Sequence, residues 1–177
     1  NVLLKEEIRV ADIPSPHIAE RDGIGLVSIG KILQSLEGCA CPMGALSREF
    51  LKRLRLQDDE VVIVDMEAGI EHFGRGVDSS IDSVLVVVEP SFDSLELAEK
   101  INALTAEIGL DNTWTVLNKV PSQDMAAKLT DALKERGVSV IGSIGYDPEV
   151  LQAGLEGRPL GGSRAEKDVA AILDHLL

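Results

Sequence analysis

Two cysteines separated by one residue, Cys39 and Cys41, are the only cysteines in this 177-residue chain. A disulfide between residues two apart is strained, and a reducing compartment disfavours it further. Pro42 follows, and apolar residues then recur at helical spacing, so the sequence predicts a helix that begins near Cys41. The positive end of a helix favours thiolate, the form of cysteine that binds metal.

Two thiolates leave a tetrahedral metal ion half coordinated, and no further cysteine is present to complete the site. A two-fold axis through the site would turn two sulfur ligands into four. The cysteine pair therefore predicts a metal held between two copies of the chain. The alternative, which the spacing leaves open, is a pair of buried and inert cysteines.

Polar residues also follow two of the apolar runs that we interpret as strands. Asp65 ends the run at 61–64, and Gly69 lies four residues further on. This pattern suits a magnesium-bound acid followed by a hinge that senses a γ-phosphate. A helix-capping Asp beside a turn glycine explains it equally well. Asn118 ends another run and is suited either to a purine edge or to a turn after a strand.

The runs themselves predict the fold. Residues 61–64, 83–89, 113–118 and 138–144 are apolar on both faces, which is typical of central strands in a parallel sheet. Amphipathic helical windows lie between them, at 97–108 and 125–133. Three helix starts are expected from their sequences, namely Asp93 with Glu96, Ser163 with Glu166, and Asp147 before Pro148. The chain is therefore predicted to be an α/β protein with a mostly parallel sheet flanked by helices on both faces.

We expect one α/β domain over residues 1–177, with an irregular part at 1–38 and a repeating helix and strand part at 39–177. Residues 25–32, GLVSIGKI, match most of a phosphate-loop pattern, but Ile32 replaces its final Ser or Thr and strand formers fill the loop. The segment 25–29 is better interpreted as an edge strand. An opening strand followed by a phosphate-binding turn is missing from the sequence.

Composition narrows the possible partners. Apolar residues make up 45% of the chain and aromatic residues 3%, so the core must be aliphatic. The formal charge of −13 argues against nucleic acid and against an anionic membrane surface as partners. No apolar run reaches the length of a membrane span and no signal sequence opens the chain, so we expect a cytoplasmic protein.

Three stretches together, CAC at 39–41, VVIVDMEAGIEHFGRG at 61–76 and VLNKV at 116–120, resemble the CooC-type maturation ATPases of carbon monoxide dehydrogenase. These belong to the deviant-Walker P-loop ATPases, alongside the nitrogenase iron protein and the Min and Par ATPases. The resemblance covers roughly residues 24–177. It implies a homodimer that binds ATP or ADP with magnesium, carries nickel or zinc between its subunits, and inserts nickel into carbon monoxide dehydrogenase.

The resemblance also implies roles for particular residues. Cys39 and Cys41 would be the metal ligands, and Asp65 would be the Walker B-like acid that binds magnesium. Gly69 would be the switch glycine, and Asn118 would contact the adenine. Tyr146 and Asp147, in the segment GSIGYDP, would be weaker base contacts.

The chain departs from the family pattern in its phosphate site. The glycine-rich loop with its two lysines and the catalytic Asp after the second strand are absent from the sequence. Efficient ATP hydrolysis by this chain alone is therefore not expected. The start at Asn1 favours a missing segment over a paralogue that has lost catalysis. Two alternative functions stay open: a nucleotide-independent scaffold or regulatory protein, and a partition-type ATPase, which the acidic last helix disfavours.

Overall fold

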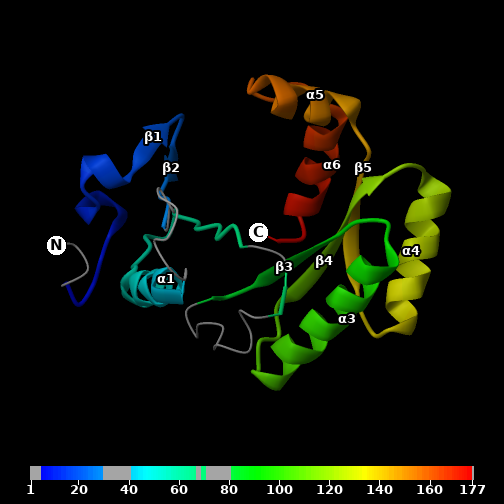
Figure 1. Cartoon of the computed structure of the whole chain (residues 1–177), viewed down its shortest axis with the longest axis horizontal. Helices are drawn as coiled ribbons and strands as arrows, with labels where there is room; N and C mark the ends of the chain where they lie inside the picture. The colour runs from blue at the N-terminus through cyan, green and yellow to red at the C-terminus, as the bar shows by residue number, and fades with distance from the viewer. Residues whose placement is uncertain (1–4, 30–40, 67–68, 71–80, 177) are drawn as a thin grey trace. The chain divides into compact units, whose positions relative to one another are not determined.

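The computed structural model describes residues 5–29, 41–66, 69–70 and 81–176, which Figure 1 shows in colour. The contacts within it separate two compact units. We call the part within residues 5–66 the N-terminal unit, and the part within residues 69–70 and 81–176 the sheet unit. Whether the two units act as the single domain that the sequence predicts stays a prediction.

The sheet unit is built on three parallel strands, β3 (Val84–Val88), β4 (Thr113–Val120) and β5 (Val140–Gly145), in that spatial order. Residues of β3 pair with β4 from Val84 opposite Thr113 to Val88 opposite Leu117. The pairing of β4 with β5 is interrupted by two register shifts. The predicted parallel strands at 83–89, 113–118 and 138–144 are thus confirmed, with β4 in the centre.

Helices lie on both faces of this sheet, as predicted, but one face of β3 is left uncovered in the described part of the chain, since Leu85 and Val87 are 47% and 55% exposed. Helices α3 (Phe92–Glu107) and α4 (Gln123–Glu135) pack on one face, and α6 (Arg164–Leu173) packs along β5 on the other (Figure 1). A short helix, α5 (Pro148–Glu156), lies between β5 and α6 in the chain. The sheet unit is therefore an α/β layer structure.

The core of the sheet unit lies between the sheet and helices α3 and α4, and it is wholly aliphatic. Its buried members are Val86, Val88, Ala98, Ile101, Leu117, Val120, Leu129, Leu133 and Val138. On the other face, Ile172 of α6 is so close to Gly142 that a Cβ at Gly142 would meet its Cγ1 at 2.5 Å. Helix α6 therefore requires glycine at this position of β5.

Short polar side chains begin each helix of the sheet unit. Ser91 caps α3 and accepts a hydrogen bond from Ser94 N at 3.2 Å, so the predicted cap at Asp93 is wrong. Asp93 instead lies in the first turn, where its negative charge complements the helix dipole. Ser122 caps α4, and the predicted caps Asp147 and Ser163 are confirmed for α5 and α6.

The N-terminal unit contains a short antiparallel hairpin and one helix. Strands β1 (Ala19–Arg21) and β2 (Ile24–Leu26) are joined by Asp22 and Gly23, both with positive φ. The 3-10 turns η2 (Val10–Asp12) and η3 (Ser15–His17) precede the hairpin, and α1 (Cys41–Arg53) follows it. Strand β2 confirms part of the edge strand expected at 25–29, and the helix expected to begin near Cys41 begins there.

The strand predicted at 61–64 is wrong. Residues 61–66 have no regular secondary structure, and the apolar side chains are exposed, with Ile63 89% accessible. β-Branched residues favour extended backbone, but a strand also needs a neighbour that accepts and donates its main-chain hydrogen bonds. No strand in the described ranges pairs with this run.

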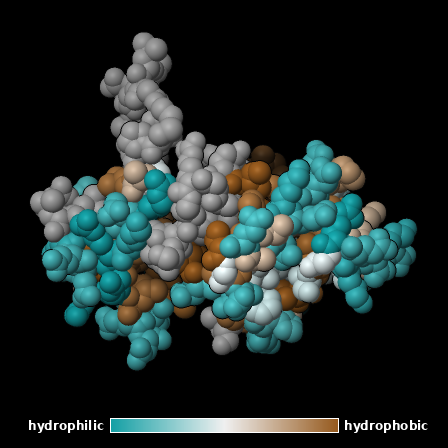
Figure 2. All heavy atoms as spheres, turned by 90° about the horizontal axis from the view of Figure 1, so that it is seen from below, coloured by the Kyte–Doolittle hydropathy of each residue, from teal (hydrophilic) through white to brown (hydrophobic). Residues whose placement is uncertain are grey.

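The described surface seen in Figure 2 is mostly hydrophilic, with hydrophobic residues distributed between the polar ones. This agrees with the acidic composition. None of the helices among the described residues combines the length and the hydropathy that crossing a bilayer requires.

Candidate functional site

The carboxyl edge of the β3–β4–β5 sheet brings together several of the residues predicted to bind a ligand. Parallel strands end at one edge of a sheet, and the helices that follow them begin there. Asn118 lies near the end of β4, and Tyr146 follows β5 directly. The backbone N–H of Tyr146 donates to the carbonyl of Val120 at 2.8 Å, which places Tyr146 beside the end of β4.

Asn118 lies in an irregular part of strand β4. The register with β5 shifts between Leu117 and Val120, and Lys119 has a φ of 55°, in the left-handed region. The side-chain Oδ1 of the half-buried Asn118 accepts a hydrogen bond from the backbone N–H of Lys119 at 2.9 Å. The strand thus ends in a bulge, which we call the β4 bulge (Asn118 and Lys119).

The lysine of the β4 bulge pairs with the neighbouring strand. Lys119 Nζ lies 2.6 Å from Glu89 Oε1, and Glu89 is the residue that follows β3. Sequence reasoning missed both the positive φ and this ion pair. The one signal available was Asn118 itself, because an Asn side chain can bond to nearby backbone and stabilise a turn.

Tyr146 is 48% exposed at the same edge. An exposed phenol ring next to the end of a strand offers a flat apolar surface on which an aromatic base can stack. The structure therefore places a hydrogen-bonding amide and an aromatic face at neighbouring strand ends. This is the chemistry that recognition of a nucleobase requires.

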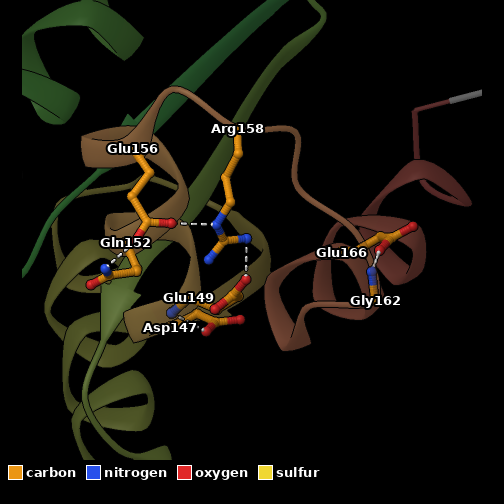
Figure 3. A network of polar contacts seen from close by, with 7 residues as sticks. All are labelled: Asp147, Glu149, Gln152, Glu156, Arg158, Gly162 and Glu166. Atoms are coloured by element: carbon orange, nitrogen blue, oxygen red, sulfur yellow. Dashed lines mark hydrogen bonds and ion pairs between the residues drawn. The ribbon is translucent and has the colours of Figure 1, made fainter.

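Asp147 has a structural task that the sequence reveals only in part. Its Oδ1 accepts from Glu149 N at 2.9 Å, and its Oδ2 accepts from Ala165 N at 3.1 Å (Figure 3 shows its place beside Glu149). Asp147 thus joins the first turns of α5 and α6. The hydrogen bond from the Ala165 backbone, followed by that from Glu149, holds the pKa of the Asp147 carboxyl below its ordinary value.

Two ion pairs run along α5 beside this cap (Figure 3). Arg158 donates to Glu149 and to Glu156, each at 2.6 Å, and so ties the two ends of the helix together. The pKa of Glu156 is lowered, first by the hydrogen bond from Arg158 and then by that from Gln152. The network thus links the first turn of α5 to its carboxyl end.

A small polar cavity of about 20 Å³ lies between the ends of β4 and β5 and the starts of α4 and α6. Ser122, Ser143, Arg164 and Asp168 are among its lining residues, and Asp168 accepts a hydrogen bond from Gly145 N at 2.9 Å. A space of this size holds about one water molecule. It is therefore not a pocket for a nucleotide.

The remaining predicted residues are described less completely. Asp65 is exposed and lies in the N-terminal unit. Gly69 has a φ of 140°, a conformation that side chains with a Cβ rarely adopt. Cys41 is the first residue of α1, and Cys39 lies outside the described residues. In the part of the chain that the structure describes, no group of three or more His, Cys, Asp or Glu side chains is arranged to hold a metal.

Searches against family models gave no match for this chain. Individual relatives do match. An uncharacterized ATP-binding protein of Methanocaldococcus jannaschii is 42% identical over 172 residues, which covers 97% of this chain and 68% of the relative. The carbon monoxide dehydrogenase accessory protein CooC of Rhodospirillum rubrum is 33% identical, over 95% of this chain and 65% of its own length.

A more distant relative is the septum site-determining protein MinD of Bacillus subtilis, which is 25% identical over 59% of this chain and 41% of its own length. The chain therefore spans about two thirds of the two more similar relatives.

Proposed function

Because the chain belongs to the MinD-like P-loop family of ATP-binding proteins, we propose that it is an ATPase-type accessory protein for nickel insertion into carbon monoxide dehydrogenase. The observation that carries the proposal is the similarity to CooC, which extends over 95% of this chain at 33% identity. The relative named CooC is an accessory protein of that dehydrogenase. We propose the same role for this chain, acting as a homodimer in the cytoplasm.

The nucleotide would bind at the carboxyl edge of the sheet. Asn118 would contact the base through its side-chain amide, and the exposed ring of Tyr146 would stack on it. Asp147 would contribute by fixing the starts of α5 and α6, since both of its oxygens already accept backbone hydrogen bonds. The residues at this edge fit an uncharged, aromatic ligand group.

Asp65 would bind magnesium, and Gly69 would be the switch glycine that senses the γ-phosphate. The Asp65 carboxylate is exposed and is a hard oxygen ligand of the kind that magnesium prefers. The bound magnesium would balance the charge of the phosphates. The φ of 140° at Gly69 is compatible with a switch that depends on glycine. No glycine-rich phosphate loop is present in the 177 residues, so these residues supply only part of an ATPase site.

The transported metal would bind to Cys39 and Cys41 of two copies of the chain. Cys41 is the first residue of α1, and thiolate is the form of cysteine that binds metal. Four thiolates from two chains would complete the tetrahedral coordination of nickel or zinc.

Metal analysis tests this site directly. Under reducing conditions we expect one nickel or zinc ion per two chains, and we expect the double variant Cys39→Ser, Cys41→Ser to lose it. Met43→Leu, which removes a nearby sulfur but no thiolate, serves as the control and should keep the metal. An unchanged metal content in the double cysteine variant, measured by plasma mass spectrometry, would rule out the proposed site.

Nucleotide binding tests the other half of the proposal. Asn118→Ala should weaken binding of a fluorescent ATP analogue about tenfold, the loss expected for one good hydrogen bond. Asn112→Ala is the matched control, because Asn112 precedes β4 at the amino edge of the sheet, where it donates to the Asp82 carbonyl. Equal effects of the two variants on nucleotide affinity, measured by fluorescence titration, would contradict a base site at the carboxyl edge.

A further inference from the structure

We infer that Glu89 is a positioning residue for the nucleotide site: through its ion pair with Lys119 it holds the β4 bulge that presents Asn118. The inference rests on the proposed nucleotide-binding function and names a residue that acts on the same site without touching the ligand. It comes from three observations on the backbone and side chains of β3, β4 and β5.

The first observation is the conformation of Lys119. A φ of 55° is unfavourable for a residue with a Cβ and is most often found in glycine, asparagine or aspartate. Such a conformation persists only when surrounding contacts determine it. The β4 bulge therefore needs contacts that hold it.

The second observation is that the bulge is held from both neighbouring strands. On the β3 side, Glu89 Oε1 lies 2.6 Å from Lys119 Nζ. On the β5 side, the Val120 carbonyl accepts the N–H of Tyr146, and the Val120 side chain is buried in the core. The β5 contact fixes the end of the bulge. The Glu89 contact holds the side chain of its left-handed residue, whose backbone N–H donates to Asn118 Oδ1.

The third observation concerns what the bulge leaves available. Asn118 Oδ1 accepts the Lys119 N–H, while the Asn118 side-chain NH₂ has no protein partner within the described ranges. This NH₂ can therefore donate to an acceptor on a ligand. Glu89 also neutralises Lys119 at this edge, which favours an uncharged base over a phosphate.

Removal of the Glu89 side chain therefore has a defined consequence. Without its carboxylate, Lys119 can return to a negative φ, and the hydrogen bond from Lys119 N to Asn118 Oδ1 breaks. The Asn118 amide then loses its fixed direction. Glycine at position 119 adopts a positive φ without steric cost, so it should make Glu89 dispensable.

A test without nucleotide uses the side-chain NH₂ signals of Asn118 in the ¹⁵N-labelled full chain, assigned by their disappearance in Asn118→Asp. In Glu89→Ala we expect these signals to move towards those of a free, solvated amide. In Glu89→Ala, Lys119→Gly we expect them to return to the original positions. Glu99→Ala, which removes the ion pair of Glu99 with Arg136, should leave them unchanged. Signals unaffected by Glu89→Ala would overturn the inference.

A second test measures specificity with mant-ATP and mant-GTP. The ratio of their dissociation constants should change about tenfold in Glu89→Ala and recover in the double variant with Lys119→Gly. If Glu89 only stabilised the fold, the melting temperature would fall while this ratio stayed constant, and the inference would be wrong. If the original chain binds neither nucleotide, the proposed function fails, while the Asn118 signals still decide the role of Glu89.

Discussion

At the scale of single residues, Asp147 shows how one side chain can carry two structural tasks at once. The sequence predicts it both as a helix cap and as a weaker base contact. The structure shows the cap, and it adds a second hydrogen bond, from Ala165 N to Asp147 Oδ2, that links α5 to α6. Because both oxygens accept backbone hydrogen bonds, the carboxylate fixes the starts of α5 and α6 relative to each other.

The lowered pKa of Asp147 makes its contribution to stability dependent on pH. A depressed pKa in the folded state stabilises the fold above the ordinary value of 3.8. This contribution is lost as the pH falls from there through the lower folded pKa. We therefore expect Asp147→Ala to lower the melting temperature by a few degrees at neutral pH and by less at about pH 3.

Thermal unfolding followed by circular dichroism at the two pH values measures this difference. Asp131→Ala, at an exposed site on α4, is the control and should show little change at either pH. The same loss of melting temperature for Asp147→Ala at both pH values would show that the charge of the Asp147 carboxylate does not contribute to stability.

At the scale of elements, Leu133 and Leu155 allow a helix side chain packed in the core to be compared with one exposed at the surface. Leu133 of α4 is fully buried, whereas Leu155 of α5 is 77% exposed. Leu133→Ala should cost about 2–5 kcal/mol of unfolding free energy, because it leaves a cavity against the sheet. Leu155→Ala should cost less than about 0.5 kcal/mol.

Urea unfolding of both variants gives the two free energies. Similar losses would mean that α5 is packed against something in solution that covers Leu155, and would contradict its exposure. A loss for Leu133→Ala below about 1 kcal/mol would contradict the position of α4 over the core.

The elements of the sheet unit could be predicted because their signals are local. The apolar runs at 83–89 and 113–118 form strands β3 and β4, and the helical windows after them are α3 and α4. The helix start at Asp93 could not be placed correctly because Ser91, two residues earlier, caps equally well.

Features that depend on contacts between residues far apart in the sequence could not be predicted. The run at 61–64 has strand composition, but whether it pairs depends on a neighbouring strand. For the candidate site, the strand ends at Asn118 and Tyr146 were predictable from the sheet pattern. The left-handed Lys119 and its pair with Glu89 were not, because that pair joins residues from two different strands.

At the scale of the whole molecule, the net charge of −13 opposes the association of two copies. Salt screens such repulsion over a Debye length of about 10 Å at 0.1 M. We therefore expect self-association of the metal-loaded chain to strengthen when sodium chloride is raised from about 0.05 M to about 0.5 M.

Sedimentation equilibrium at the two salt concentrations measures the dissociation constant. The Cys39→Ser, Cys41→Ser variant is the control, since it should stay monomeric in both. Weaker association at high salt would instead indicate that complementary ion pairs join the subunits.

The order of the strands also bears on how the sheet unit folds. Strands β3, β4 and β5 are neighbours in space in the same order as in the chain, and α3 and α4 each bridge one pair. Each of these two pairings therefore spans a single crossover. None of the three strands pairs with a strand far from it in the sequence. Mixed α/β domains, which have intermediate contact order, fold faster than β-sandwiches and more slowly than helical bundles. We expect the β3–β4 and β4–β5 units to be able to form one after the other as the polypeptide is synthesised.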